Sequence, residues 1–157
     1  MICEDIGDFA ARLPAMGAVM GLDLGTRTIG IAVSDVTRSV ATPLETLKRT
    51  KFTADALAIE ARVEARAIAG LVLGLPLNMD GSEGPRLQST QAFARNLARR
   101  GPLPLFYWDE RLSTVAAERA LLEADTSRRR RAQVIDAVAA GYILQGALDR
   151  LRHLGAA

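Results

Sequence analysis

The alternation of apolar and polar positions is clearest in residues 20–35, which read MGLDLGTRTIGIAVSD. Side chains two residues apart share one face of a strand, so this pattern predicts strands over 19–24 and 28–34. Gly25-Thr26-Arg27 stands between the two strands and provides a turn, with Gly25 suited to an unusual backbone angle. We therefore predict a β-hairpin, and we expect the rest of the chain to be organised around it.

The chain after the hairpin is predicted to alternate strands and helices. Apolar residues at steps of three and four indicate helices, whereas the run Leu71-Val72-Leu73 indicates a strand covered on both faces. Pro43 has no backbone N–H and favours an edge position for its strand. The predicted elements are a strand over 40–47, a helix over 53–66, a strand over 71–74, a loop over 76–84, a helix over 85–100, a strand over 104–108, a helix from Ser113 or Thr114 to Ala124, and a helix over 132–151.

This order of elements predicts one α/β domain over residues 17–152. Three strands form an antiparallel meander, later strands add a parallel half to the same sheet, and helices cover both faces. Residues 1–16 are expected to be an extension with a short helix through Phe9 and Leu13, and residues 153–157 a C-terminal tail. The 157 residues, 49% of them hydrophobic, suffice for such a core.

Cys3 is the single cysteine and lies near an N-terminus that we expect to be mobile. One cysteine allows no disulfide within the chain, which suits a reducing compartment. The acidic first residues do not form a secretory signal, and no apolar run approaches the roughly 18 residues of a membrane span. These features predict a cytoplasmic protein without a membrane partner.

Three acids occupy unusual positions in the predicted elements. Asp23 lies inside a strand between Leu22 and Leu24, where an uncompensated carboxylate would cost several kcal/mol. A divalent cation or a phosphate-bound cation would neutralise it. Glu110 directly follows a strand. Asp136 shares a helix face with Ala139, Ala140 and Ile143, and small alanines let that face lie close against a sheet.

Sites in open α/β sheets form outside the carboxyl ends of the strands, where the winding of the chain reverses. We expect Asp23, Glu110 and Asp136 to converge there, and a cation to offset their mutual repulsion. Oxygen ligands favour Mg²⁺ or Mn²⁺ over zinc. Carboxylates that hold one or two such ions are common equipment for phosphodiester hydrolysis.

Each acid also has a purely structural explanation. Asp23 could hydrogen-bond the hairpin turn, and Asp136 could be a first-turn acid that favours the helix dipole. Glu110 could form a surface ion pair with Arg111 or Arg119, which would contribute little to stability.

The formal net charge is only +2, so affinity for a polyanion must come from local clusters of arginine. Arg27 and Arg111 are candidates for contact with nucleic acid, and Asn78, in the loop over 76–84, is a candidate polar contact. A basic run is expected on the link before the last helix, where it would line the path of a phosphate backbone. This run consists of Arg128, Arg129, Arg130 and Arg131.

Four segments together give the sequence a resemblance to a known family. GLDLGTRTIGIAVSD, VLGLPLNMDGSEG, DERLST and IDAVAAGYILQ stand in the order and spacing of the YqgF family. That family comprises Holliday-junction resolvase-like proteins, also described as nucleases that mature the precursor of small-subunit ribosomal RNA. The resemblance implies an RNase H-like fold, with a mixed five-stranded sheet in the order 3-2-1-4-5. It also implies metal-dependent cleavage of structured nucleic acid by the acidic triad Asp23, Glu110 and Asp136.

The sequence departs from the wider fold at one position of the implied triad. RNase H-like resolvases place a glutamate at the end of the central strand, where this chain has Leu75-Pro76. Glu110 would then take that role from the neighbouring strand. We expect Asp23 to bridge the metal ions, with Glu110 and Asp136 as outer ligands.

Several functions remain open at the level of sequence. The expected one is a Mg²⁺-dependent endonuclease that processes the 5′ end of pre-16S rRNA, with pre-ribosomal particles as a further partner and a monomer or weak homodimer as the assembly. An alternative is a resolvase of four-way DNA junctions. Alternatives of other classes are a non-catalytic RNA-binding module and an actin-like ATP-binding fold, because DLGTRT also resembles the phosphate-binding hairpin of that superfamily.

Overall fold

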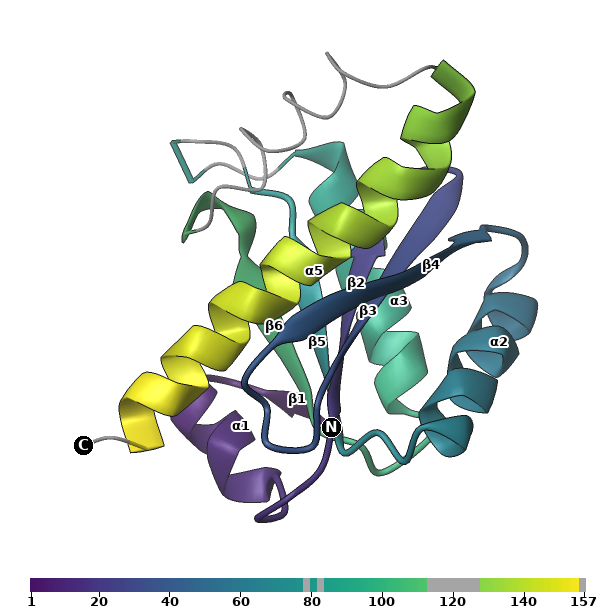
Figure 1. The fold of residues 1–157 in the computed structure, drawn as a ribbon. Helices are drawn as coiled ribbons and strands as arrows, with labels where there is room; N and C mark the ends of the chain where they lie inside the picture. Colours follow the sequence, from purple (N-terminus) through teal and green to yellow (C-terminus); the bar gives the residue numbers. More distant parts are fainter. Residues whose placement is uncertain (78–79, 82–83, 113–127, 156–157) are drawn as a thin grey trace.

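The computed structural model describes residues 1–77, 80–81, 84–112 and 128–155, with the side chains of residues 128–134 excepted. It consists of one six-stranded sheet in the order β1-β6-β5-β2-β3-β4, with helices on both faces (Figure 1). The elements are β1 (Ile2–Cys3), α1 (Ile6–Arg12), β2 (Val19–Leu24), β3 (Thr28–Ser34), β4 (Ala41–Lys48), α2 (Phe52–Ala65), β5 (Gly70–Leu75), α3 (Pro85–Ala98), β6 (Leu105–Asp109), the 3₁₀ turn η1 (Glu110–Leu112) and α5 (Arg128–Gly155).

The central strand β2 separates two apolar layers. Met20, Leu22 and Leu24 face α2 and α3 and belong to one buried cluster, whereas Val19 belongs to the cluster beneath α5. Figure 1 shows α5 lying obliquely across one face of the sheet, with α2 and α3 behind it. The period of two in β2 thus assigns each side chain to one layer, and residue 23 falls on the α5 side.

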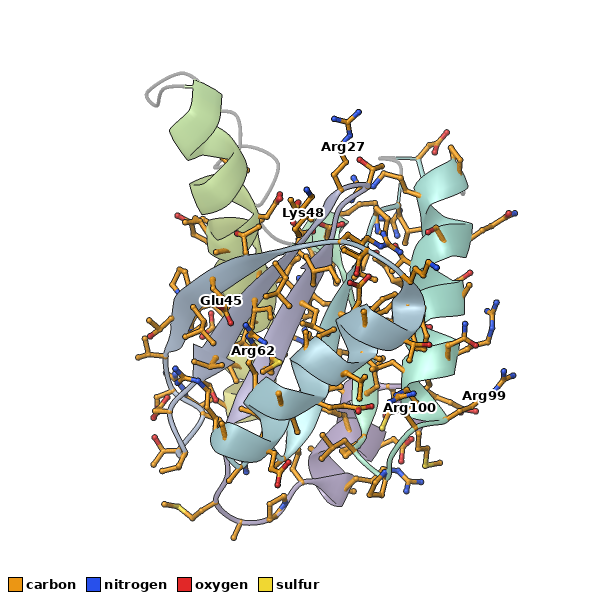
Figure 2. All side chains as sticks on the ribbon, turned by 90° about the vertical axis from the view of Figure 1, so that its right-hand side faces the viewer. Arg27, Glu45, Lys48, Arg62, Arg99 and Arg100 are labelled. Carbon is orange, nitrogen blue, oxygen red and sulfur yellow. The ribbon has the colours of Figure 1, made fainter. Side chains whose placement is uncertain are left out.

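The predicted meander is confirmed. β2 pairs antiparallel with β3, and β3 with β4, while β5 and β6 extend the sheet as parallel strands. Pro43 lies in the edge strand β4, at a register shift opposite Ile31 and Ala32. Arg62 of α2 forms an ion pair with Glu45 of β4, so this edge is also tied to the helix behind it (Figure 2).

The sheet contains one strand more than the five predicted. Residues 2–3 form β1, which pairs parallel with β6, so the N-terminal segment is part of the sheet. The predicted short helix is present as α1, and its Phe9 is fully buried against Phe106. Cys3 is 3% exposed, which contradicts the expectation of a mobile N-terminus. A strand of two residues is too short for any periodicity to predict.

The last helix is longer than predicted at both ends, and it begins at Arg128. The prediction that the basic run lies on a link before this helix is therefore wrong. The first turn of α5 is instead formed by Arg128, Arg129, Arg130 and Arg131. Arginine has a high helix propensity, and a run of four can therefore extend a helix toward its N-terminus.

Two further expectations concern helices. The predicted helix from Ser113 or Thr114 to Ala124 lies outside the described residues. No helix among the described residues is long and apolar enough to cross a membrane.

We expect the thiol of Cys3 to be protected in the folded protein. Burial excludes reagents and raises the pKa of Cys3, so little reactive thiolate forms at neutral pH. Reaction with a chromogenic disulfide should be much slower for native protein than for the same protein in urea. Equal rates in the two conditions would show that β1 is not docked on the sheet.

Candidate active site

Asp23 lies near the carboxyl end of the central strand and is 3% exposed. Its directly opposite partner on β3 is Gly30, and its other neighbours along the strand are the apolar Leu22 and Leu24. A buried carboxylate in an aliphatic strand has a high desolvation cost unless charge or hydrogen bonds compensate it. Asp23 therefore destabilises the fold unless neighbouring groups compensate its charge.

Gly30 is the position at which α5 approaches the sheet most closely. A Cβ atom on Gly30 would collide with the backbone carbonyl of Asp136, and one on Gly21 would lie 2.9 Å from the carbonyl oxygen of Ala140. Both contacts are with helix backbone, which cannot move aside as a flexible side chain can. Glycine at these two sites lets the helix pack directly against β2 and β3, with Asp136 beside the Asp23–Gly30 pair.

Asp136 faces the sheet as predicted. Ala139, Ala140 and Ile143, which share its helix face, are all buried, and the hydroxyl of Thr28 donates a hydrogen bond to the Asp136 carboxylate. Asp136 lies eight residues after the first residue of α5, which is more than two turns into the helix. It is therefore not a first-turn acid, and the helix dipole does not account for it.

The two aspartates line one open hollow of about 330 Å³. Its other walls come from the hairpin turn and from the start of α3. The complete lining is Asp23, Gly25, Thr26, Arg27, Thr28, Arg86 and Asp136. Two carboxylates, two guanidinium groups and two hydroxyl groups thus surround a space that is open to solvent, a composition suited to a phosphate together with a cation.

Glu110 lies beside Asp23 on the side toward β5, whereas Asp136 lies on the side toward β3. Its carboxyl carbon would lie 3.3 Å from a Cβ atom on Gly74, near the end of β5. Leu22 of β2 pairs with Leu73 of β5, so the next residues in the parallel register are Asp23 and Gly74. Asp23 therefore stands between two glycines, with Asp136 over Gly30 and Glu110 over Gly74. Glu110 itself does not line the hollow.

The carboxylates and hydroxyl groups of the hollow are oxygen donors of the kind that bind a divalent cation. Within the described ranges, no three side chains of His, Cys, Asp or Glu gather closely enough to hold a metal ion. Asp23 and Asp136 nevertheless share one hollow, with the Thr28 hydroxyl beside them. Magnesium binds through one or two carboxylates and completes its shell with water and substrate phosphate, so this pair fits Mg²⁺. A metal-ligand role for Glu110 stays a prediction.

The predicted nucleic-acid contacts lie in different surroundings. Arg27 projects from the hairpin tip at one end of the molecule (Figure 2). Arg111 is held in a fork by Asp109, with bonds of 2.6 to 3.1 Å that lower the pKa of Asp109, and it approaches Gly81 of the loop. Asn78 lies outside the described residues. The side chains of the basic run are also outside the described part of the chain, namely those of Arg128, Arg129, Arg130 and Arg131.

Sequence reasoning missed four residues that shape this site. Thr28 orients Asp136, Gly30 admits the helix, and Arg86 lines the hollow. Arg49 donates to the carbonyl of Gly25 at 2.6 Å and so supports the turn. Only Gly30 carried a usable signal, because a glycine inside an alternating strand often marks the close approach of another backbone.

The structural comparisons match this chain to solved structures of the RNase H-like fold. The structural match to Thermus thermophilus RuvC in complex with a Holliday junction has a TM-score of 0.52 at 14% identity, covering 85% of this chain and 94% of that one. The yeast mitochondrial Holliday junction resolvase Ydc2 matches with a TM-score of 0.50 at 10% identity, covering 94% and 86%. At such identities the likeness shows the fold alone, and it confirms the predicted RNase H-like fold.

The sequence comparisons are more specific than the structural ones. A profile of the RuvX family, described as Holliday junction resolvase, matches residues 17–150. The chain is 73% identical over 155 residues to a Paracoccus denitrificans protein named "Putative pre-16S rRNA nuclease", covering 99% of this chain and 98% of that protein. A protein of the same name from Rhodobacter capsulatus is 67% identical over 157 residues, with coverage of 100% and 99%. The chain belongs to the RuvX family, which confirms the resemblance inferred from its motifs.

We expect Gly30→Ala to destabilise the protein by roughly 1 to 3 kcal/mol or more, because the new methyl group would meet helix backbone. Gly101→Ala is the matched control, since nothing lies within 4 Å of a Cβ at that position. Urea unfolding of both variants measures the difference. Equal stability of the two variants would contradict the close approach of α5 over Gly30.

Proposed function

We propose that the protein is a metal-dependent nuclease that hydrolyses phosphodiester bonds in the precursor of 16S ribosomal RNA. The observation that carries the proposal is that the buried Asp23 shares with Asp136 a hollow that is open to solvent and bordered by Arg27 and Arg86. A paired acid site that only stabilised the fold would not need cationic walls or solvent access. The names of the close relatives support the same activity.

In this proposal five side chains of the hollow have a defined task, those of Asp23, Arg27, Thr28, Arg86 and Asp136. Asp23 and Asp136 would hold a Mg²⁺ or Mn²⁺ ion, and Glu110, which lies beside Gly74, would be the third acid ligand. The bound cation supplies positive charge that stabilises the charge developing on the phosphate during hydrolysis. Thr28 fixes the Asp136 carboxylate through its hydrogen bond. Arg27 and Arg86 attract and orient the phosphate, because guanidinium groups match its oxygens geometrically.

The choice of RNA as substrate rests on the relatives' names, whereas the family description favours a four-way DNA junction. A junction resolvase makes two coordinated nicks and works as a symmetric dimer. An RNA-processing nuclease can act as a monomer with one hollow. We favour the RNA precursor because the close relatives carry that name, with pre-ribosomal particles as the setting and the cytoplasm as the location.

We expect Asp23→Asn and Asp136→Asn each to lower Mg²⁺-dependent cleavage of a pre-16S rRNA fragment by about 100-fold or more, since electrostatic stabilisation of a transition state is worth about 10²- to 10³-fold. Asp149→Asn is the control, because Asp149 lies further along the same helix and bonds Gln145. Its cleavage rate should equal that of the wild type. Full activity of both site variants, in protein free of contaminating nuclease, would exclude the proposal.

A four-way DNA junction and a pre-16S rRNA fragment should be compared side by side with the same protein preparation. We expect faster Mg²⁺-dependent cleavage of the RNA, and no cleavage of either substrate in excess chelator. Symmetric, paired cleavage of the DNA junction with intact RNA would instead assign the protein to junction resolution. Both rates are measured on end-labelled substrates resolved by denaturing electrophoresis.

A further inference from the structure

A second hollow lies on the other side of the hairpin tip from the two aspartates. It encloses about 450 Å³ and shares Gly25, Thr26 and Arg86 with the first hollow. Its complete lining is Leu24, Gly25, Thr26, Arg49, Pro85, Arg86, Ser89 and Thr90. The two hollows are therefore adjacent, and Arg86 borders both.

Arg49 and Arg86 are fixed in this second hollow by backbone carbonyl groups of the hairpin. Arg86 donates to the carbonyl of Leu24 at 2.8 Å, and Arg49 donates to that of Gly25 at 2.6 Å. The Arg49 guanidinium also lies 5.4 Å from the centre of the Phe93 ring. Among the described residues that line this hollow there is no acid.

This arrangement leaves strong hydrogen-bond donors directed at a shared space. A guanidinium group has five N–H donors in a fixed plane, and the carbonyl contact of each arginine occupies only one nitrogen. The lining of this hollow contains two guanidinium groups and no acid, so an anionic ligand is favoured there. The two acids that Arg86 also borders belong to the first hollow. The start of α3 at Pro85 borders the same hollow and adds the positive end of a helix dipole.

We propose that this second hollow binds a backbone phosphate of the nucleic-acid strand next to the phosphate that is cleaved. The strand would cross the hairpin tip, with the cleaved phosphate beside Asp23 and Asp136 and its neighbour between Arg49 and Arg86. This inference rests on the proposed nuclease function and adds a binding subsite to it. The site reads no base, because its charged donors address phosphate oxygens and its other walls are apolar or small.

Binding is tested in an Asp23→Asn background, in which the RNA stays intact, by fluorescence anisotropy over a series of KCl concentrations. Arg49→Ala and Arg86→Ala should each weaken binding about 5- to 10-fold and lower the slope of log K against log salt by about 0.7 to 0.9, the value for one phosphate contact. Arg99→Ala is the matched control. It removes one arginine from the opposite end of α3, far from Arg27, and should change neither quantity (Figure 2).

Three outcomes would overturn the subsite. Unchanged affinity and salt slope in Arg49→Ala, whose arginine lines only the second hollow, with RNA still bound, would reject the subsite and leave the nuclease proposal intact. Weaker binding at an unchanged slope, together with a lower melting temperature, would assign the arginines to support of the hairpin. Tight ATP binding by calorimetry that is lost in Arg86→Ala would assign the hollow to a free nucleotide. Absence of both RNA binding and cleavage in the wild type would instead reject the nuclease proposal itself.

Discussion

The contact between the backbone of α5 and the glycines of the central strands determines the geometry of the candidate site. Gly30 and Gly21 have no side chains on the face where the helix crosses, so the carbonyl groups of Asp136 and Ala140 lie directly over the sheet. Gly74 of β5 likewise has no side chain on this face, and the Glu110 carboxyl group lies beside it. Acids from a strand, a strand end and a helix can approach one another only because this row of the sheet carries no bulk.

This contact also explains how the protein tolerates a buried carboxylate. Asp23 would be costly in a continuous aliphatic layer, but it borders a hollow that is also lined by hydroxyl and guanidinium groups. The Thr28 hydroxyl donates a hydrogen bond to the Asp136 carboxylate and so fixes its orientation. The close packing of α5 over Gly30 places Asp136 at the hollow, so a loss of this packing should also disturb the site.

Much of this architecture could be predicted from the sequence because it depends on short-range periodicity. The period of two placed the hairpin strands at their observed bounds, Pro43 indicated the edge strand, and the alanines after Asp136 indicated an inward face. The remaining features depend on tertiary contacts. β1 has too few residues for a pattern, and Arg49 and Arg86 are 37 positions apart and meet only through the hairpin turn.

The most direct test of the account is the position of a bound manganese ion. Crystals of the wild-type protein soaked in millimolar MnCl₂ allow the ion to be located from its anomalous diffraction. We expect a peak in direct contact with the carboxylate oxygens of both Asp23 and Asp136. A peak held by other residues, or no peak beside Asp23 in a well-ordered crystal, would contradict the account.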